Sequence, residues 1–494
     1  MLTRIFIRDK LVLSKIRKGK EMLKNIICII LAWLQTAGFS VLNYLKPNET
    51  QTIGVNKFVE HQIFEGFGTS SAWWSQTIDN EETAREIARL LYDDETGLGL
   101  DIYRYNIGGG EKENPATRIG DVNRRTESFY VLNEKTGKYE YDFTRDANAR
   151  RMLDMAVEYG AKEVILFCNS PHFSMTESGQ ASGGLTEYAS NLPKENYAAF
   201  VDYVLTIADW FVEQGYPVTA ISPINEPQWK WGGDWVGQEG CHYSADETVA
   251  VLELFALEMQ KRNSPYKLSG PESGQLSPEY YEYIDKFFAS DILNEFCDTY
   301  SGHSYWIDNN LWVKTDVGNK FAEQYPEKKL EMSEWCELPL KIDSTTIDSG
   351  LYMANIIAQD LNLMNAVSWQ SWTAVNGDGL MELINGELVI YNRYYAYKHF
   401  ASFIKPGMAR IDIMDSLKGE SKVVSTAFTD GKETVLVLIN NEETSQLIDL
   451  YGSYSSTEMY LTDEMNNCNR IYSGNFFRET TLPARSITTI VLTK

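Results

Sequence analysis

Histidine and cysteine are scarce in this chain of 494 residues, which holds five histidines and six cysteines. No HExxH sequence and no CxxC pair occurs, and the cysteines are not spaced as metal ligands or as a disulfide framework. We therefore predict no catalytic metal and no cofactor, and we expect the cysteines of the mature chain to be buried thiols. The sequence also lacks an internal repeat and a GxGxxG segment that opens a helix, so a dinucleotide-binding sheet is not indicated.

Basic residues are outnumbered: 45 Lys and Arg stand against 69 Asp and Glu, which gives a net charge of −24 and a pI near 4.7. This imbalance argues against nucleic acid or an anionic membrane surface as a partner, whereas a neutral substrate remains compatible. Aromatic residues are abundant at 13%, with 12 Trp and 29 Tyr. Aromatic planes stack on the C–H faces of sugar rings, so the composition permits a carbohydrate ligand without requiring one.

The first 25 residues reverse the overall charge, because they hold eight Lys or Arg against Asp9 and Glu21. The apolar run of nine residues from Ile26 to Leu34 follows, and then the small residues of Gln-Thr-Ala-Gly-Phe-Ser. This order is typical of a secretory signal, and nine residues are too few to span a bilayer. We predict a basic segment and signal peptide over residues 1–40, with Met22 as an alternative start, and a secreted, periplasmic or cell-surface product. A buried helix or a membrane anchor is the alternative.

Short apolar runs alternate with amphipathic helical stretches from about residue 60 to residue 405. Eight such runs are expected as strands: 63–68, 101–107, 163–168, 218–224, 266–270, 297–303, 329–333 and 366–372. Parallel strands need crossover connections, so eight strands that alternate with helices predict a (β/α)8 barrel over residues 60–405. A doubly wound open sheet is the alternative.

The pattern changes after Pro406 to short β-branched segments separated by turn residues. The segments 423–428, 433–439, 458–462 and 486–492 are expected as strands, and residues 53–58 could add another from before the barrel. We predict an antiparallel β-sandwich side domain formed by residues 52–58 and 406–494. The polar insertion of residues 111–141 is expected to form a rim of the active site.

One strand end carries an amide and a carboxyl group in Asn225-Glu226-Pro227. The preceding run from Val218 is short and β-branched, and Pro227 ends it. In a parallel α/β barrel, catalytic groups lie at the carboxyl ends of the strands. Glu226 is therefore a candidate general acid, although a carboxylate at the start of a helix is the simpler explanation for one residue alone.

A second glutamate ends another strand in Leu330-Glu-Met-Ser-Glu334-Trp335. It lies 108 residues after Glu226, or three units of 36, which is about the length of one βα unit. Both glutamates would then point into one mouth, where two carboxyl groups about 5–5.5 Å apart can cleave a glycosidic bond with retention. One must be protonated while the other is ionised. Glu331 and Glu337 compete with Glu334, which the strand-end position favours.

These motifs, together with Glu65-Gly-Phe-Gly68, resemble family 30 of the glycoside hydrolases over residues 52–494. The resemblance implies a retaining glycoside hydrolase whose catalytic glutamates lie on barrel strands four and seven. It assigns Glu226 as general acid/base and Glu334 as nucleophile. Asn225 would hydrogen-bond the sugar 2-hydroxyl.

The same resemblance implies supporting roles for four further residues. His303 and Tyr305 match the family's His-x-Tyr, and Tyr305 would donate a hydrogen bond to Glu334. Arg104 would add positive charge near the nucleophile, and Trp372 would be a sugar platform. The alternatives are that Arg104 only bridges strands and that Trp372 only fills the barrel.

Aromatic and polar residues after other strands suggest the substrate. Trp73 and Trp74, Asn169 and Trp229 stand at such positions, and the segments 68–74 and 169–171 look similar to the branch acting on β-1,6-linked galactan. We therefore expect an endo-β-1,6-galactanase that acts on a polysaccharide as a monomer. The open alternatives are activity on β-1,6-glucan, xylan or glucosylceramide, a transferase, and a carbohydrate-binding protein without catalysis.

Overall fold

The computed structural model describes residues 24, 26–37, 51–417 and 420–494. The chain divides into two compact units, Phe64–Pro406 and the described part of Met1–Ile63 with Gly407–Lys494. From the sequence we drew the barrel boundaries at residues 60 and 405.

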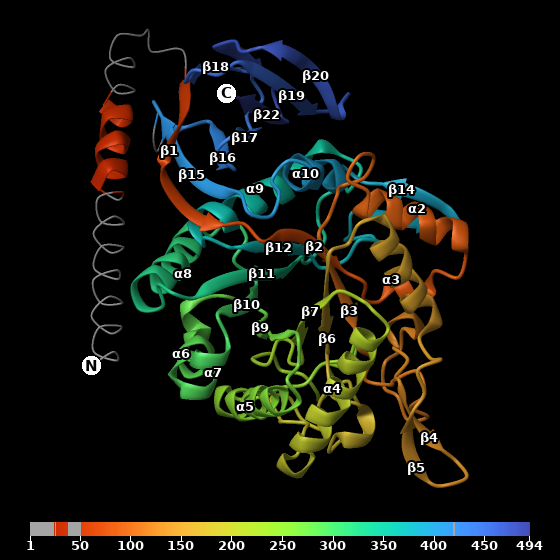
Figure 1. Ribbon diagram of the computed structural model, residues 1–494. Helices are drawn as coiled ribbons and strands as arrows, with labels where there is room; N and C mark the ends of the chain where they lie inside the picture. The colour runs from red at the N-terminus through yellow and green to blue at the C-terminus, as the bar shows by residue number, and fades with distance from the viewer. Residues whose placement is uncertain (1–23, 25, 38–50, 418–419) are drawn as a thin grey trace, which may run out of the picture. The chain divides into compact units, whose positions relative to one another are not determined.

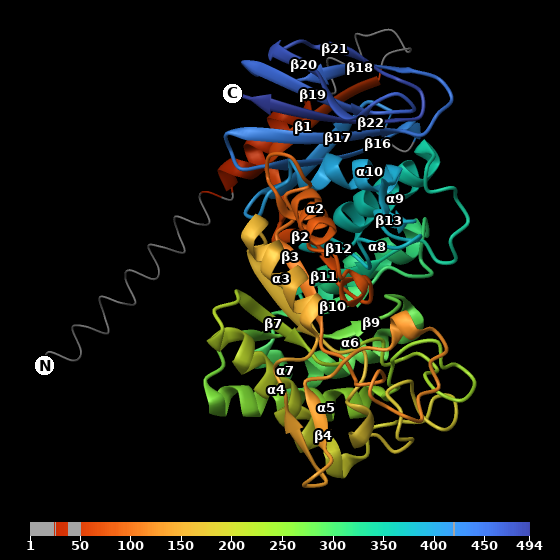
Figure 2. The same ribbon diagram turned by 90° about the vertical axis from the view of Figure 1, so that its right-hand side faces the viewer.

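The unit Phe64–Pro406 is a closed, all-parallel barrel (Figures 1 and 2). Its strands are β2 (Gly66–Ser70), β3 (Ile102–Asn106), β6 (Glu163–Phe167), β7 (Val218–Ser222), β8 (Lys267–Leu268), β9 (Pro271–Ser273), β10 (Thr299–His303), β11 (Lys329–Trp335) and β12 (Ser368–Ser371). The order of pairing is β8-β7-β6-β3-β2-β12-β11-β10-β9. Because β8 and β9 are consecutive in the chain, together they form the fifth strand and close the ring. The predicted (β/α)8 barrel is confirmed.

Helices follow the barrel strands and cover the outside of the ring (Figure 1). They are α2 (Glu81–Tyr92), α3 (Ala147–Tyr159), α4 (Tyr197–Glu213), α5 (Ala245–Arg262), α6 (Tyr281–Ala289), α7 (Asp291–Phe296), α8 (Leu311–Gln324), α9 (Ile347–Leu363) and α10 (Asn392–Ala401). Side-chain hydrogen bonds fix where two of these helices begin. The Asn80 side chain accepts the Thr83 N–H to begin α2, and Ser244 and Glu247 form a capping box at α5.

The first predicted barrel strand was placed too early. Ile63 ends the long strand β1 (Gln51–Ile63), and the first barrel strand, β2, begins only at Gly66. The apolar run that we read as one strand therefore belongs to two strands in different units. Hydrophobicity alone does not mark this break, since Ile63 and Phe64 flank it on both sides.

The second unit is one nine-stranded sheet with the order β20-β19-β22-β17-β16-β15-β1-β18-β21. Its other strands are β15 (Ala409–Asp415), β16 (Val423–Thr429), β17 (Glu433–Asn440), β18 (Gln446–Tyr451), β19 (Ser456–Thr462), β20 (Asn467–Asn475), β21 (Glu479–Leu482) and β22 (Ser486–Thr493). Ile53, Leu436, Ile448 and Ile490, from four different strands, share one apolar core. The predicted β-rich side domain with an N-terminal strand is confirmed.

The expectation of a purely antiparallel side domain is wrong at one place. Strand β1 pairs antiparallel with β15 but parallel with β18, with Thr52 opposite Asp449. Because β1 enters from before the barrel, no short hairpin fixes its direction relative to β18. It fills the position between two strands that come from the other end of the chain.

The predicted signal segment falls largely on residues outside those described. Within it, residues 26–37 are helical, and the Asn56 side chain donates to the Ala32 carbonyl at 3.2 Å. Among the described residues, no helix combines the length and hydrophobicity needed to cross a membrane. The expectation of buried thiols holds for Cys168, Cys241, Cys297, Cys336 and Cys468, which are all free and buried.

A buried ion pair joins two of the outer helices. Lys314 on α8 donates to Asp360 on α9 at 2.6 Å, and both side chains are fully buried. Asp360 also accepts hydrogen bonds from the Ser304 hydroxyl and the Trp369 indole. The carboxylate therefore ties both helices to the segments around β10 and β12.

We expect Lys314→Met to lower the free energy of unfolding by about 3–5 kcal/mol, because it leaves Asp360 as a buried carboxylate without its cation. The double variant Lys314→Met/Asp360→Asn should recover a large part of this loss. Urea unfolding followed by tryptophan fluorescence measures both. A loss below about 1 kcal/mol for the single variant would contradict the assignment.

Candidate active site

Two glutamates and a histidine meet at the carboxyl ends of the barrel strands. Glu226 follows β7, Glu334 lies near the end of β11, and His303 is the last residue of β10. One carboxylate oxygen of each glutamate and one ring nitrogen of His303 lie within 4.8 Å of one another. Enzymes that act with retention hold their two carboxyl groups about 5–5.5 Å apart, and an oxygen–oxygen distance of at most 4.8 Å fits that arrangement.

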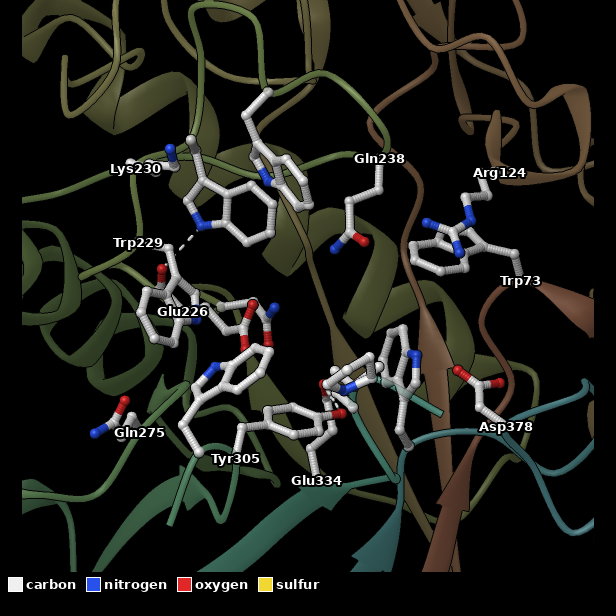
Figure 3. Close-up of a pocket in the computed structure, with 17 residues that line it drawn as sticks. Trp73, Arg124, Glu226, Trp229, Lys230, Gln238, Gln275, Tyr305, Glu334 and Asp378 are labelled. Carbon is white, nitrogen blue, oxygen red and sulfur yellow. Dashed lines mark hydrogen bonds between the residues drawn. The ribbon is translucent and has the colours of Figure 1, made fainter. Parts of the chain in front are cut away.

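The backbone turns sharply at Glu226, which has φ of 47° in the left-handed region. Its N–H donates to the Glu272 carbonyl at 2.9 Å, and its own carbonyl accepts the Trp231 indole N–H at 2.9 Å. A non-glycine residue in this conformation persists only where its surroundings hold it, and such sites are often functional. The turn directs the carboxyl group into the mouth rather than along the strand (Figure 3).

Glu334 receives two strong hydrogen bonds. The Tyr305 hydroxyl donates to Oε1 at 3.0 Å, and Arg104 donates from Nη1 to Oε2 at 2.9 Å. Burial raises the pKa of Glu334, the charges of His303 and Arg104 oppose that effect, and the negative charge of Glu226 adds to it. The net effect is a raised pKa of Glu334, which the hydrogen bond and charge of Arg104 and the charge of His303 only partly oppose.

His303 stands between three carboxylates. Its Nδ1 lies 3.2 Å from Glu226 Oε1 and 3.6 Å from Glu334 Oε1, while its Nε2 lies 3.1 Å from Glu272 Oε2. Burial alone would lower the pKa of His303, but the three carboxylates outweigh it and raise the pKa to about 10. The ring is therefore an imidazolium at neutral pH.

Asn225 and Asn169 belong to a chain of side-chain amides. Asn225 Nδ2 donates to Asn169 Oδ1 at 3.2 Å, and Asn169 Nδ2 donates to Asn106 Oδ1 at 3.2 Å. The Asn225 Oδ1 atom is buried and accepts no hydrogen bond from the described residues, although Asn225 lines the cavity. Asn169 is not among the described residues that line the cavity, and its hydrogen bond holds the Asn225 side chain.

Above these groups lies a cavity of about 640 Å³ (Figure 3). Six tryptophans line it: Trp73, Trp229, Trp231, Trp235, Trp306 and Trp372. Trp73 packs edge-on against Trp372 at 5.3 Å between ring centroids, and the Arg124 guanidinium lies 4.8 Å from the Trp73 ring. The predicted rim insertion thus contributes Arg124 to the site.

Trp74 does not belong to this wall. Its indole N–H donates to the Ser70 carbonyl at 3.0 Å, the ring is buried, and it is not among the described residues that line the cavity. Because Trp73 and Trp74 are neighbours at a tight turn, their side chains leave the backbone in different directions. Of the two tryptophans predicted to contact substrate, Trp73 lines the cavity and Trp74 does not.

The structure separates Glu334 from its two competitors. Glu331 accepts hydrogen bonds inside the barrel from Ser301 at 2.8 Å and Ser368 at 2.9 Å. Glu337 accepts the backbone N–H groups of residues 341 and 342. Neither is among the described residues that line the cavity, whereas Glu334 is.

Several residues of the site were missed from the sequence. Glu272 is the most important, and the sequence offered a signal for it, since it lies two residues after the predicted fifth strand, as Glu226 lies two residues after the predicted fourth. The remaining residues are provided by loops without a regular pattern: Arg124, Lys230, Trp235, Gln238, Gln275, Trp306, Leu338, Pro339 and Asp378. Their positions depend on how those loops fold.

Comparison with known proteins gives consistent results. The model of the family described as O-Glycosyl hydrolase family 30 matches residues 50–381. An endo-beta-1,6-galactanase from Hypocrea rufa is 22% identical over 422 residues, which cover 78% of this chain and 80% of that protein. A glucuronoxylanase from Bacillus subtilis (strain 168) is 22% identical over 504 residues and covers 96% of this chain and 99% of its own length.

Solved structures share the fold. A conserved exported protein from Bacteroides fragilis superposes with a TM-score of 0.81 at 27% identity, over 89% of this chain and 100% of that chain. A GH30 endoxylanase from Clostridium papyrosolvens C71 has a TM-score of 0.67 at 22% identity, over 90% of this chain and 100% of that chain.

A buried carboxylate supports the loop that holds the cavity tryptophans. Glu239 is fully buried and accepts the Gly109 N–H at 3.0 and 3.1 Å and the Thr126 hydroxyl. Burial raises the pKa of Glu239 to about 8, and the nearby charge of Glu111 adds to this effect. The loops after β3 and β7 are thus joined through a carboxyl group that stays protonated at neutral pH.

The contribution of Glu239 to the free energy of unfolding should therefore fall as pH rises from about 4.5, the ordinary pKa of a glutamate, to about 8. In that range the unfolded chain releases the Glu239 proton and the folded chain keeps it. We expect Glu239→Gln to remove this dependence. As pH rises, the free energy of unfolding of the variant should therefore increase relative to that of the parent protein, by up to about 1.4 kcal/mol per pH unit. Urea unfolding at pH 5, 6, 7 and 8 measures the difference. Parallel curves for the parent, the variant and an exposed control, Glu95→Gln, would refute the account.

Proposed function

This chain belongs to family 30 of the O-glycosyl hydrolases, and from that premise we propose that it cleaves β-linked polysaccharide by double displacement with retention. The observation that carries the proposal is the distance of at most 4.8 Å between an oxygen of Glu226 and an oxygen of Glu334. Inverting enzymes separate the two carboxyl groups by about 6.5–9.5 Å to leave room for water.

In the first step, the Glu334 carboxylate attacks the anomeric carbon from one face of the sugar. The glycosidic C–O bond breaks, and Glu226 gives its proton to the departing oxygen. The product is a glycosyl ester of Glu334 and a free sugar hydroxyl. In the second step, Glu226 takes a proton from water, whose oxygen attacks the same carbon and releases Glu334. Two inversions at one carbon give net retention.

The charges around the two glutamates support this assignment of the proton. Glu226, Glu272 and Glu334 provide three carboxyl groups, while Arg104 and His303 provide two positive charges. One proton on the carboxyl pair brings the buried group to neutrality, which lowers the cost of burying it. Glu334 already receives Tyr305 and Arg104, and the mechanism proposed above gives the transferred proton to Glu226.

The walls of the cavity support a sugar substrate. Trp372 and Trp229 present apolar rings beside the carboxyl groups, and the unpaired Oδ1 of Asn225 can accept a hydroxyl donor. Such a hydrogen bond strengthens as positive charge develops at the anomeric carbon, so it lowers the barrier more than it tightens substrate binding.

We expect Glu334→Ala to lower the turnover of an aryl β-glycoside by about 10⁴-fold or more, because the covalent step is lost. Glu226→Ala should lose about 10²–10⁴-fold, and less with a good leaving group that needs no proton.

Azide should restore turnover in both variants. The product should be the β-azide for Glu226→Ala and the α-azide for Glu334→Ala, identified by proton NMR. Glu95→Ala, an exposed glutamate, serves as the control. Undiminished hydrolysis by either active-site variant would rule out the mechanism.

Among polysaccharides, we propose β-1,6-linked galactan, cleaved within the chain. The segments 68–74 and 169–171 support this choice, as does the similarity to an endo-beta-1,6-galactanase over 78% of the chain. The competing substrate is glucuronoxylan, because a glucuronoxylanase is equally identical over 96% of the chain. The Arg124 guanidinium at the cavity wall is a feature that an acidic sugar could use.

Product analysis separates these substrates. We expect oligosaccharides of several lengths from β-1,6-galactan, and at least about 100-fold lower kcat/KM on β-1,6-glucan and glucuronoxylan, since a changed sugar leaves polar groups of the site unpaired. Chromatography of the products over time measures chain lengths and rates. Cleavage of xylan alone would overturn the choice of galactan but leave the retaining mechanism intact.

A further inference from the structure

Glu272 is the third carboxylate of the buried group, and its position keeps it away from substrate. It follows the break in the fifth barrel strand, has φ of 56°, and is 1% exposed. It is not among the described residues that line the cavity. Its backbone carbonyl accepts the Glu226 N–H, so it also fixes the turn that aims the proton donor. Any role in catalysis must act through other residues.

Both oxygens of the Glu272 carboxylate face donors. Oε1 accepts the Ser222 hydroxyl at 2.7 Å and lies 3.4 Å from Arg104 Nη2. Oε2 accepts the Ser333 hydroxyl and lies 3.1 Å from His303 Nε2. Burial alone would raise the pKa of Glu272, but Arg104 and His303 outweigh it and lower the pKa to about 2. Glu272 is therefore a fixed negative charge.

This fixed charge determines the state of His303. A carboxylate only accepts hydrogen bonds, so the ring nitrogen that faces Glu272 must carry a proton. The other nitrogen, Nδ1, faces the carboxyl groups of Glu226 and Glu334. Arg104 and Tyr305 also contact this cluster, and the charges of Glu331 and the Cys336 thiol act on it from the neighbouring positions of β11 and the loop after it. Three acceptors around one ring favour the imidazolium with both nitrogens protonated.

An imidazolium in this place can serve both halves of the reaction. Before the first step, Glu334 is ionised, and the Nδ1–H at 3.6 Å stabilises it. Once the glycosyl ester forms, Glu334 is neutral and Glu226 has lost its proton. The same Nδ1–H, which lies 3.2 Å from Glu226 Oε1, then faces the new negative charge. The donor stays in place while the charge moves from one glutamate to the other.

We propose that Glu272 is a positioning residue that holds His303 doubly protonated between Glu226 and Glu334, so that one N–H stabilises whichever of the two is ionised. This inference rests on the proposed function for its kinetic consequence, but the protonation of His303 can be measured without any substrate.

The first test is the protonation of His303 in the folded protein. The chain holds only five histidines, so nitrogen-15 labelling of histidine gives few ring signals, and His303→Asn identifies the signal of interest. We expect both ring nitrogens of His303 to carry protons at pH 7 in the parent protein. In Glu272→Gln, which keeps the shape but removes the charge, His303 should lose a proton at least about one pH unit earlier. A neutral His303 at pH 7 in the parent protein, or an unchanged titration in the variant, overturns the proposal.

The second test is kinetic and separates charge from shape. Glu272→Gln should lower kcat on an aryl β-glycoside by roughly 10- to 100-fold with little change in KM, because Glu272 positions other groups and does not touch substrate. Glu272→Asp keeps the charge and should retain the imidazolium and more of the activity. Equal losses in both variants with an unchanged His303 would show a purely structural role and overturn the proposal.

Glu331→Gln is the matched control, because Glu331 is another barrel glutamate, half-buried, that accepts hydrogen bonds from serines. It should shift the titration of His303 much less than Glu272→Gln does. Circular dichroism verifies that each variant is folded. If Glu226 and Glu334 proved dispensable, the proposed function would fail while the NMR result on Glu272 and His303 would stand by itself.

Discussion

Three carboxyl groups, one imidazole and one guanidinium are buried together at the mouth of the barrel, and the cost of burying their charges governs the site. Removing an isolated carboxylate from water is expensive, and burying opposite charges in contact with it offsets part of that cost. Glu272 with Arg104 and His303 supplies the balance that lets Glu226 and Glu334 lie within 4.8 Å of each other.

The barrel brings these groups together because its strands are all parallel and its sheet closes into a ring. Parallel strands end on the same side, so residues that are distant in sequence share one small volume. Arg104 from β3, His303 from β10 and Glu334 from β11 come from three crossover units. The interrupted fifth strand contributes twice, since it closes the ring and places Glu272 beneath His303.

Beyond the strand ends, loops form much of the wall of the cavity. Trp229, Trp231 and Trp235 belong to the long connection after β7, and that connection is held by the buried Glu239. The carboxyl groups thus lie at the strand ends, whereas much of the cavity wall comes from loops. An endo-beta-1,6-galactanase and a glucuronoxylanase are each 22% identical to this chain.

The sequence by itself determined the barrel, the side domain with its N-terminal strand, and the pair Glu226 and Glu334. Each of these depends on local patterns: short apolar runs, a proline after a strand, and the regular length of a βα unit. Even the distinction between Glu334, Glu331 and Glu337 followed from position at a strand end. Parallel pairing of β1 with β18 did not follow, because strand direction across a long insertion leaves no local signal.

Only the tertiary structure decided that Trp73 lines the cavity and Trp74 does not, and that Asn169 orients Asn225. It also revealed Glu272, whose importance comes entirely from its neighbours. A residue's protonation and role depend on the charges and donors within a few ångströms, and those come from other strands. The sequence names candidate residues, but only their burial and their distances in the folded protein show which of them share the site.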